Sequence, residues 1–341
     1  MRTADFDYHL PAELIAQQAR PRGTSRMLVL DRRADRLRFS DVRALPACLR
    51  PGDVLLRNDV RVIPARIRAR RPGGGSAELM LVRPTADDTW EVLARPAKRL
   101  RAGIALTLRC GAAVPVERVG EGRWLVAFDP PLDAAHLEEV GEVPLPPYIR
   151  REHGPEESDR GRYQTVYARQ GRAVAAPTAG LHFTPELLES VSARGVSTVS
   201  VTLHVGPGTF QPVKAEDPRD HRLDPEDYEI PESTAREING ALAAGRRVVC
   251  VGTTSCRALE HALSVGHGRL ASGAGRAEAY IVPGYRFLGT GALLTNFHLP
   301  RSTLLMLVSA WAGRERVLAA YREAVAAGLH FYSFGDAMLA L

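Results

Sequence analysis

Two short segments of this chain combine residue types that polar catalysis needs, and they flank one predicted helix and strand. Residues 177–183 (PTAGLHF) and 204–210 (HVGPGTF) each hold a histidine, a hydroxyl group and glycine, which permits close backbone approach to a ligand. Between them, residues 184–195 predict a helix that begins at Thr-Pro-Glu and ends at glycine, and residues 196–203 predict a buried strand.

The positions of these segments favour a binding site. α/β sheets place ligands at helix N-termini and strand C-termini. Either segment alone is more often a structural turn, but two of them around one helix–strand unit favour a site. Its candidate residues are Thr178, Gly180, His182, His204, Gly206, Gly208 and Thr209.

Hydroxyl residues also follow a predicted buried strand at residues 247–252. Thr253, Thr254 and Ser255 begin the next predicted helix, where unpaired backbone N–H groups can bind an anion or a polar ligand. The glycine and lysine spacing of a Walker A loop is absent.

Two further polar groups follow predicted strands. Residues 294–303 end a strand and begin an apolar helix through Trp311, and they contain Asn296, His298 and Thr303. Strand 54–59 ends in Asn58, Asp59 and, two residues on, Arg61. Asp59 and Arg61 either form a salt bridge at the strand end or line the site, and the sequence leaves both open.

The composition describes a globular protein without a membrane segment. The 341 residues are 45% hydrophobic and 25% charged, and no apolar run is long enough to cross a bilayer. The four cysteines show no CxxC pair or zinc-ligand spacing, so we expect reduced thiols, no metal site and a cytoplasmic location.

Basic residues concentrate in one stretch. The net charge is +6, and residues 60–101 hold ten basic against four acidic residues. Such a stretch predicts contact with a polyanion such as RNA, whereas a solvated arginine-rich β surface is the alternative; composition alone does not separate them. The candidate nucleic-acid contacts are Arg68, Arg70, Lys98 and Arg99.

The same part of the chain predicts a separate β unit. Short alternating segments separated by glycine-rich or charged turns indicate a small barrel or sandwich, and the proline-rich residues 141–148 form a stiff connector. We therefore predict an α/β main domain with a mixed sheet (residues 1–64 and 149–341), interrupted by a small β-barrel (residues 65–148). The predicted strands of the insertion are residues 65–70, 77–82, 90–94, 104–108, 113–119 and 123–128.

The flanking regions predict α/β elements. A short helix at 10–15 precedes a strand at 25–31 and its hairpin partner at 36–40. After the insertion we expect strands at 163–167 and 173–176, a loop or lid at 214–231, and helices at 233–244 and 314–327.

Several long blocks together resemble one family. They are AVAAPTAGLHFTPELL (173–188), VTLHVGPGTFQPV (201–213), VGTTSCRALE (251–260) and TNFHLPRSTLLMLVSAWAG (295–313). Residues 5–18, 25–32, 52–67, 145–149 (LPPYI) and 162–168 match as well. They resemble the S-adenosylmethionine:tRNA ribosyltransferase-isomerase family of queuosine biosynthesis along its whole length.

The resemblance implies an activity and its partners. The ribosyl part of S-adenosylmethionine is transferred to 7-aminomethyl-7-deazaguanine in a tRNA with a GUN anticodon and isomerised, giving epoxyqueuosine while adenine and methionine leave. S-adenosylmethionine is then a cosubstrate and no cofactor is implied. We expect a monomeric enzyme with a β-barrel inserted in its α/β domain.

This chemistry fits the residue types. Expelling adenine needs a proton donor and forming a sulfur ylide needs a base at C5′, so His182, His204 and His298 are catalytic candidates. Any of them is alternatively a core histidine bonded to backbone. For the methionyl carboxylate or an RNA phosphate, the candidates are the Thr253–Ser255 turn and Arg257, with Glu260 in the same block. Asn296 and Thr303 are candidates for a nucleobase edge or the ribose diol.

Three positions depart from the family pattern. Asp224 stands where a second histidine of His-x-x-His is usual, and Ala277 and Gly291 also differ. A paralogue that ribosylates a free deazapurine or another nucleobase is therefore an alternative, and a non-catalytic tRNA-binding relative is another. Intact site blocks argue against the latter.

Overall fold

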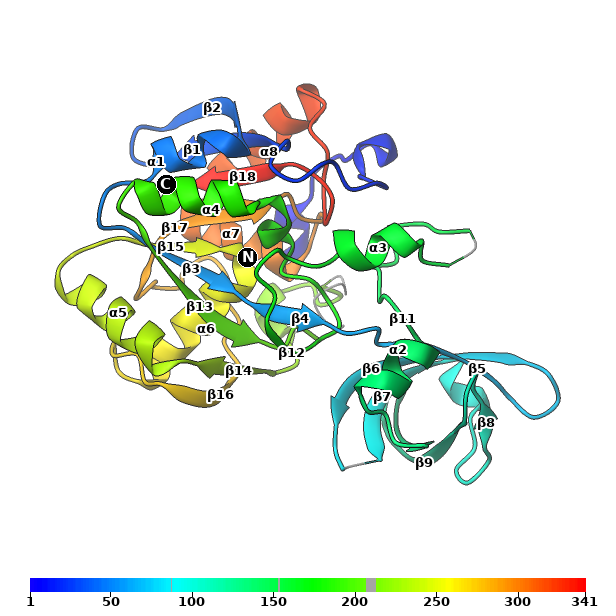
Figure 1. Ribbon diagram of the computed structural model, residues 1–341. Helices are drawn as coiled ribbons and strands as arrows, with labels where there is room; N and C mark the ends of the chain where they lie inside the picture. Colours follow the sequence, from blue (N-terminus) through cyan, green and yellow to red (C-terminus); the bar gives the residue numbers. More distant parts are fainter. Residues whose placement is uncertain (87, 153, 207–212) are drawn as a thin grey trace.

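The computed structural model describes residues 1–86, 88–152, 154–206 and 213–341. In these ranges the chain forms a large mixed sheet covered by helices and a separate antiparallel barrel beside it (Figure 1). No helix in the described ranges is long and apolar enough to cross a membrane. Across the large sheet the strands are β16 (Gly273–Ala277), β14 (Glu226–Ile230), β13 (Ser197–Leu203), β3 (Val54–Asn58), β15 (Val248–Val251), β17 (Thr290–Asn296), β18 (Ala337–Ala340), β1 (Arg26–Asp31) and β2 (Arg36–Asp41).

The large sheet has a parallel centre and antiparallel margins. β13, β3, β15 and β17 are parallel neighbours, and β18 is parallel to β1. β14 and β16 continue one side antiparallel, β17 and β18 are antiparallel, and β1 and β2 form the predicted hairpin. The carboxyl ends of four parallel strands therefore meet at one edge, which is where α/β sheets bind ligands.

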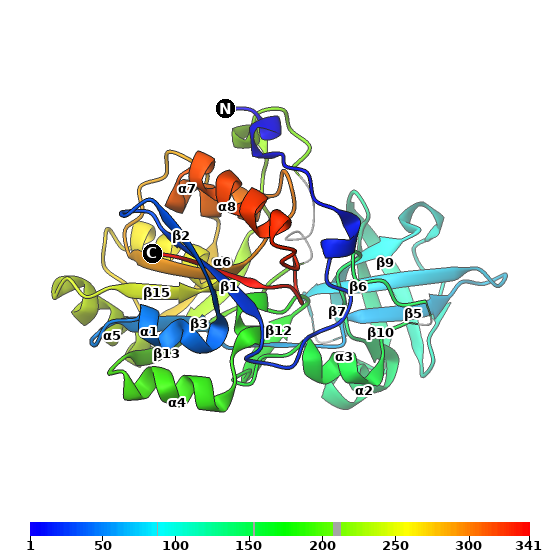
Figure 2. The same ribbon diagram turned by 90° about the horizontal axis from the view of Figure 1, so that it is seen from above.

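Helices cover both faces of this sheet, because alternate residues of each buried strand point to opposite faces. In β3, Val54 and Leu56 join one core cluster while Leu55 joins the other. Figure 2 shows α7 and α8 on one side of the sheet and α1 and α4 on the other. One face packs against α5 (Glu232–Ala243), α6 (Gly252–Val265), α7 (Thr303–Ala312) and α8 (Arg314–Ala326); the other packs against α1 (Leu45–Cys48) and α4 (Pro185–Ala193).

Local signals explain where α4 begins and ends. The Thr184 hydroxyl accepts a hydrogen bond from the backbone of Leu187 at 3.1 Å, Pro185 occupies the first turn, and Gly195 has a φ of +78° just beyond the helix. The predicted helix and the strand β13 that follows it are confirmed.

The second sheet closes on itself. Its strands pair antiparallel in order, and β5 (Arg66–Arg70) also pairs with β8 (Leu106–Thr107), which makes a six-stranded barrel with β11 (Gly141–Glu142) at its margin. The six predicted strands are all present, although β8 is only two residues long. The elements are β5 (Arg66–Arg70), β6 (Ser76–Pro84), β7 (Thr89–Arg95), β10 (Arg123–Asp129), β9 (Ala112–Gly120), β8 (Leu106–Thr107), β11 (Gly141–Glu142), the short helix α2 (Ala134–Val140) and the 3-10 turn η4 (Ala97–Arg99).

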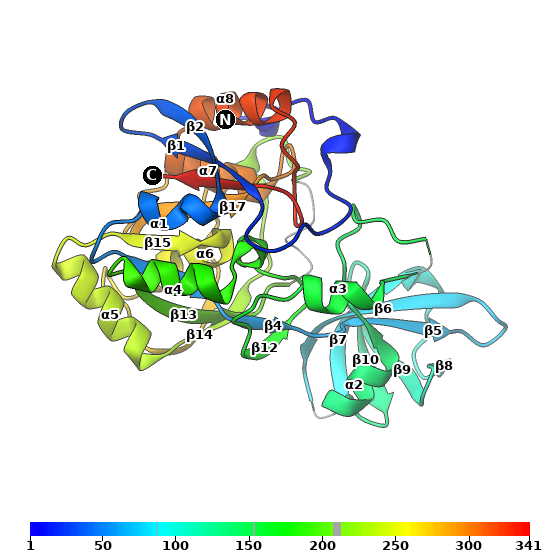
Figure 3. The same cartoon turned by 45° about the horizontal axis from the view of Figure 1, so that its top comes forward.

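Short elements lie between the barrel and the main sheet. Figure 3 shows α3 and the pair of strands β4 and β12 in this position. Both core clusters and the connector meet near here, since Val174 packs in the barrel core while Ala173 packs in the main core. The division at residues 64/65 and 148/149 remains our proposed domain boundary. The elements are β4 (Val60–Val62), β12 (Gln170–Ala173) and α3 (Glu157–Arg162).

Two sequence predictions in the main domain are wrong. Residues 163–167 form turns after α3 rather than a strand; Tyr163 and Tyr167 are buried in core clusters, so their alternation reflects burial without strand pairing. β12 ends at Ala173, so the strand predicted at 173–176 is also displaced. The polar passage 214–231 is not only a loop: β14 lies within it and pairs with β13 and β16.

Candidate active site

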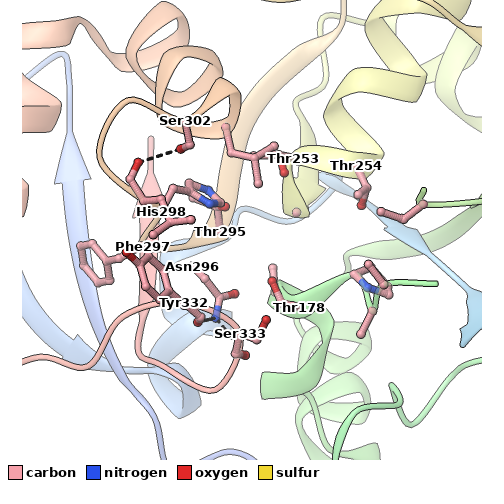
Figure 4. Close-up of a pocket in the computed structure, with 18 of the residues that line it drawn as sticks. Thr178, Thr253, Thr254, Thr295, Asn296, Phe297, His298, Ser302, Tyr332 and Ser333 are labelled. Carbon is pink, nitrogen blue, oxygen red and sulfur yellow. Dashed lines mark hydrogen bonds between the residues drawn. The ribbon is translucent and has the colours of Figure 1, made fainter. Parts of the chain in front are cut away.

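A pocket lies at the carboxyl edge of the large sheet, beyond β15 and β17. The empty space within it, which is continuous with solvent, is about 650 Å³. Figure 4 shows Thr253 and Thr254 from α6 facing Asn296 and His298 across it, with Thr178 below. Thr178 begins η5 (Thr178–His182), the 3-10 turn before α4. These five predicted residues are therefore brought together.

The α6 side of the pocket suits a negatively charged group. Gly252 starts the helix with a φ of +88°, the left-handed region that favours glycine. A Cβ there would lie 3.4 Å from the Thr254 Oγ1 atom, which is buried and has no hydrogen-bond partner among the described residues. The N-terminus of this 14-residue helix offers unpaired N–H groups and the positive end of its dipole.

His298 forms part of the opposite wall in a neutral state. Burial lowers the pKa of His298 to about 3, so the imidazole carries no extra proton near neutral pH. Its Nε2 atom lies 2.8 Å from Oγ1 of Thr295, and its backbone is tied to Tyr321 and Tyr8 through their hydroxyl groups. The ring is thus held in place and can hydrogen-bond or accept a proton.

A left-handed turn closes the pocket beside Asn296. Tyr332 has a φ of +72°, which costs a non-glycine residue roughly 1–3 kcal/mol unless its surroundings enforce it. Asn296 donates from Nδ2 to the Tyr332 carbonyl at 2.8 Å, and the Tyr332 and Tyr148 rings pack with centroids 4.6 Å apart. The Tyr148 hydroxyl lies 2.8 Å from Oγ of Ser333. Contacts from two parts of the chain therefore hold this turn.

His182 lies behind this pocket and does not line it. Its side chain is buried; Nδ1 lies 3.0 Å from Oγ of Ser25, and Nε2 has no hydrogen-bond partner in the part of the chain described. Burial lowers the pKa of His182 to about 4, although Asp336 and the Asn296 side chain oppose that effect.

His204 belongs to a different pocket, between the main sheet and the barrel. It is lined from the barrel by Arg83 and from the main sheet by His204 and Gly206. Nδ1 of His204 accepts a hydrogen bond from the Arg172 backbone at 3.0 Å, so Nε2 carries the proton of the neutral ring. Burial lowers the pKa of His204, and Arg172 adds to that effect.

The guanidinium of Arg257 is hydrogen-bonded to other groups of the protein. Its guanidinium donates to Glu226 at 2.6 Å and to three backbone carbonyls, those of Asp224, Ala277 and Ala279. Its side chain is only 10% exposed and borders the pocket that contains His204 and a smaller pocket that contains Thr253 and Thr254. This geometry describes a buried anchor whose donors are already used.

Two other members of the same helix face inward. The Ser255 hydroxyl donates to the Val251 carbonyl at 2.8 Å. Glu260 is fully buried and accepts hydrogen bonds from the backbones of Leu288, Gly289 and Thr290 at 2.7–3.0 Å. Both stabilise α6 and its surroundings, and neither lines the main pocket.

Asn58 and Asp59, at the end of β3, bond to the end of the neighbouring strand β13. Asn58 donates to the carbonyl of Leu203 and accepts from its N–H, both at 3.0 Å. Asp59 accepts from the Thr202 hydroxyl at 2.7 Å, whereas Arg61 is exposed on β4. The Asp59–Arg61 salt bridge, one of the two alternatives that the sequence left open, is not among the ion pairs of the described residues.

The remaining candidates occupy varied positions. Gly180 is packed so closely that a Cβ would lie 2.2 Å from the Tyr167 hydroxyl. Thr303 begins α7 and lines a small pocket beside the main one that also contains Thr253 and Thr254. Gly208 and Thr209 lie outside the described residues.

The candidate RNA contacts are exposed on the barrel. Arg68 and Arg70 alternate outward along β5, and Lys98 and Arg99 lie in η4. Arg68 is engaged with Glu142, with Nε and Oε1 2.8 Å apart, so part of its charge is already neutralised.

Three pocket residues were missed in the sequence. Tyr332 and Ser333 arrive from the segment before β18, and Tyr148 arrives from the connector after the barrel. The resemblance did include Tyr148, in the block LPPYI. No local pattern indicates that a tyrosine adopts a left-handed conformation.

The departures from the family pattern fall mostly away from this pocket. Gly291 lies at the start of β17, at the end opposite Asn296, and Ala277 contributes its carbonyl to Arg257. Asp224 forms an ion pair with Arg123 of the barrel and lines the pocket that contains His204. Only Asp224 therefore lies in a pocket lined by candidate site residues.

No cluster of three or more His, Cys, Asp or Glu side chains with metal-ligand geometry occurs within the described ranges. The donor set of the main pocket consists of hydroxyl, amide and imidazole groups. These groups can supply hydrogen bonds and proton transfer beside the N-terminus of α6.

Comparison with known proteins gives consistent results over the whole chain. The family model described as "Queuosine biosynthesis protein" matches residues 3–340. S-adenosylmethionine:tRNA ribosyltransferase-isomerases from Thermus thermophilus and Geobacter sulfurreducens are 53% and 49% identical, over 98% and 99% of both chains. The crystal structure of an S-adenosylmethionine tRNA ribosyltransferase from Thermotoga maritima matches with a TM-score of 0.56 and 36% identity, covering 99% of this chain and 100% of that chain.

An α/β enzyme with an inserted β-barrel is the class that the fold and the pocket define. The chain belongs to the queuosine biosynthesis protein family, and it is an enzyme of the transferase and isomerase type. The resemblance inferred from the sequence blocks is confirmed, as is the fold class.

Proposed function

We propose that this enzyme transfers and isomerises the ribosyl moiety of S-adenosylmethionine onto 7-aminomethyl-7-deazaguanine in a tRNA anticodon. The product is epoxyqueuosine in tRNA, with release of adenine and methionine. The names of the full-length relatives support S-adenosylmethionine and tRNA as substrates. We further propose a monomeric cytoplasmic enzyme that acts on tRNAs with GUN anticodons.

One observation supports this proposal most directly: the N-terminus of α6 and the C-terminal end of β17 line the same pocket. The methionyl carboxylate is the anion that suits the α6 N-terminus, with Thr253 and the unpartnered hydroxyl of Thr254 as additional donors. The packed rings of Tyr148 and Tyr332 line the same pocket and can attract the sulfonium by a cation–π interaction. Arg257 is not needed as a carboxylate ligand in this arrangement.

His298 is the histidine that we assign to proton transfer. It lines the pocket, whereas His182 does not and His204 belongs to the neighbouring one. Burial keeps the ring neutral, so one ring nitrogen is able to accept the C5′ proton next to the sulfonium, although the same burial makes it a weaker base than an exposed histidine. Removing that proton gives a sulfur ylide at C5′, and expelling adenine requires that a ring nitrogen of the leaving base receive a proton as its bond to C1′ breaks.

Adenine release tests the proposed function against its alternatives. The enzyme is incubated with S-adenosylmethionine and either tRNA carrying 7-aminomethyl-7-deazaguanine, the free base, or no acceptor. Release that requires the modified tRNA supports the proposal. Release with the free base alone favours a paralogue with a nucleobase acceptor, and absence of release in all arms with retained tRNA binding favours a non-catalytic relative.

The His298→Gln variant tests whether His298 is the base. Glutamine retains a polar side chain of similar reach but cannot accept the proton. We expect kcat to fall by about 10²–10⁴-fold with little change in S-adenosylmethionine binding. An unchanged kcat removes His298 from the proton-transfer role.

A further inference from the structure

The pocket that contains His204 lies between the main sheet and the barrel, and no step proposed above uses it. Its empty space, continuous with solvent, is about 840 Å³, against about 650 Å³ in the pocket beyond β15 and β17. A smaller pocket lies between them and shares Thr253 and Thr254 with the first and Arg257 with the second. Thr253 and Arg257 are four residues apart on α6, about 6 Å along its axis. A ligand in the His204 pocket is therefore within reach of one bound at the α6 N-terminus.

The surroundings of His204 fix both its ring and its tautomer. Nδ1 accepts a hydrogen bond from the Arg172 backbone N–H at 3.0 Å; because a backbone N–H can only donate, Nδ1 has no proton and Nε2 has one. Gly171 packs against the ring with a φ of +99°, and a Cβ there would lie 3.0 Å from Cε1 of His204. No hydrogen bond among the described residues uses Nε2. The ring is thus held in place and has one donor left for the pocket.

The charged residues that line this pocket balance one another. Two of its arginines already form ion pairs, Arg257 with Glu226 and Arg83 with Glu91 of the barrel. A site for an RNA phosphate needs a surplus of positive charge, which this lining does not have. The charged residues are Arg83, Arg172, Arg257, Asp224, Glu226 and Asp227.

Two of the acidic residues place acceptors beside the donor of His204. Asp227 is exposed on β14, and its carbonyl accepts from the His204 backbone N–H at 2.9 Å. Asp224 is held at the border of the barrel by its ion pair with Arg123. Both line the pocket. The pocket therefore offers one fixed donor and carboxylate acceptors near it.

Apolar side chains reach the same pocket from both domains. Val82 and Pro84 come from β6 of the barrel, and Leu223 and Pro225 come from the segment before β14. A guanine-type base combines apolar faces with an edge on which the 6-oxo oxygen accepts and N1 and the exocyclic amine donate. The lining of this pocket matches that combination.

We propose that the His204 pocket binds the acceptor nucleobase, a 7-deazaguanine, and that Nε2–H of His204 donates a hydrogen bond to its 6-oxo oxygen. The carboxylates of Asp224 and Asp227 accept from the N–H groups of the base. The identity of the acceptor rests on the proposed function. His204 is then a substrate-binding residue that takes no proton during the reaction, and the barrel supplies one wall of the base site.

Replacing His204 by phenylalanine removes the donor and keeps a ring. The ligands are an anticodon stem-loop RNA that carries 7-aminomethyl-7-deazaguanine and one whose modified base lacks the 6-oxo oxygen. We expect wild type to bind the first about fivefold more tightly or better, and His204→Phe to bind both equally. Affinity for S-adenosylhomocysteine, a cosubstrate analogue that belongs in the other pocket, should stay within about twofold.

His261→Phe is the matched control. His261 is half-buried on α6, and its Nδ1 also accepts a hydrogen bond from a backbone N–H, that of Glu278 at 3.4 Å. It is not among the residues that line the three pockets. This variant should keep the wild-type preference for the 6-oxo oxygen.

Three results overturn the proposal. Wild-type enzyme that binds both stem-loops equally makes no hydrogen bond to the oxygen. Equal weakening of modified and unmodified stem-loops in His204→Phe indicates an RNA phosphate in the pocket instead of the base. A loss of kcat and of one limb of the pH profile, with unchanged stem-loop affinity, indicates proton transfer by His204.

The wild-type protein offers a measurement that does not depend on the folding of a variant. In nitrogen-15 NMR, the Nε2–H signal of His204 should shift when the modified stem-loop is added and not when S-adenosylhomocysteine is added alone. If adenine is released with modified tRNA while this signal does not shift, the base site fails and the proposed function stands. If free 7-aminomethyl-7-deazaguanine shifts the signal but modified tRNA releases no adenine, the proposed function fails and the base site stands.

Discussion

Nη1 of Arg257 lies 2.6 Å from Oε2 of Glu226, and the other carboxylate oxygen of Glu226 accepts a hydrogen bond from the Gly206 N–H at 2.9 Å. One buried ion pair thus joins helix α6 to the first residues of the glycine-rich segment after β13. The arginine of the sequence block VGTTSCRALE therefore acts on that segment through Glu226.

Replacing Arg257 should therefore affect folding. Arg257→Ala removes a buried ion pair with Glu226 and the donor to three backbone carbonyls, and we expect the free energy of unfolding to fall by about 3–5 kcal/mol. Urea unfolding measures it. The matched control is Arg276→Ala, which breaks an exposed pair with Asp227 at 3.7 Å and should cost at most about 1 kcal/mol. Equal losses in the two variants would contradict the anchoring role.

Replacing Thr254 should weaken ligand binding without lowering the stability of the folded protein. Its hydroxyl is buried without a partner in the described part of the protein, so Thr254→Val should leave the free enzyme as stable as wild type or more stable. The same change removes a donor for the carboxylate, and the affinity for S-adenosylhomocysteine should fall about tenfold or more.

Thr234→Val is the control for the stability measurement. The Thr234 hydroxyl donates to the Ser200 carbonyl at 2.7 Å, so the same substitution there leaves a partly buried carbonyl with one partner fewer. It should lower the melting temperature and leave ligand affinity unchanged. If Thr254→Val loses stability as Thr234→Val does, or keeps full affinity, Thr254 is not a ligand-binding hydroxyl.

Local sequence signals predicted the elements that carry most of the pocket. Thr184, Pro185 and Gly195 define α4 because capping depends on neighbouring residues in the chain. Thr253 and Thr254 follow a strand with parallel neighbours, so the general rule on strand carboxyl ends placed them correctly in the pocket. The six barrel strands were predictable because turns separate short alternating segments.

The rest depends on contacts between distant segments. The sequence predicts Arg257 as a substrate-binding residue, yet its guanidinium donates to backbone carbonyls in and beside β16 and just before β14. These carbonyls belong to segments distant from Arg257 in the sequence or separated from it by a turn, so no local pattern indicates the contacts. Tyr148 and Tyr332 meet across 184 residues, and the left-handed turn at Tyr332 is enforced by these contacts. β14 was missed because it is rich in acidic residues, of which Asp227 and Glu229 are exposed while Glu226 is buried.

Acid should destabilise the folded enzyme through its buried histidines. The pKa of His298 is lowered by burial from 6.5 to about 3, so below pH 6.5 the unfolded chain binds a proton there that the folded protein does not. Stability present above pH 6.5 is therefore lost as the pH falls toward 3, by up to about 1.4 kcal/mol per pH unit from this residue.

The slope of unfolding free energy against pH measures this effect. Between pH 6 and 4.5, His298→Gln should show a shallower slope than wild type, by roughly one bound proton. His9→Gln changes an exposed histidine and should reproduce the wild-type slope. A slope that His298→Gln does not alter would mean that His298 takes up its proton in the folded state.

The exposed arginines of the barrel carry the last prediction, which concerns tRNA. Arg68, Arg70 and Arg99 lie on β5 and η4, and their joint replacement by alanine should weaken tRNA binding. Each phosphate contact contributes about 0.7–0.9 to the slope of log affinity against log salt concentration, so the slope should flatten. Because Arg68 is already paired with Glu142, we expect the loss to correspond to fewer than three contacts.

The matched control is a second triple arginine-to-alanine variant, at the margin of the large sheet. Arg33, Arg36 and Arg38 are exposed on and beside β2, and their replacement also lowers the net charge by three. A general charge effect would give both triple variants the same salt dependence. A specific RNA surface on the barrel alters the slope only in the first variant, and S-adenosylhomocysteine binding should stay unchanged in both, because the pocket lies at the carboxyl edge of the large sheet.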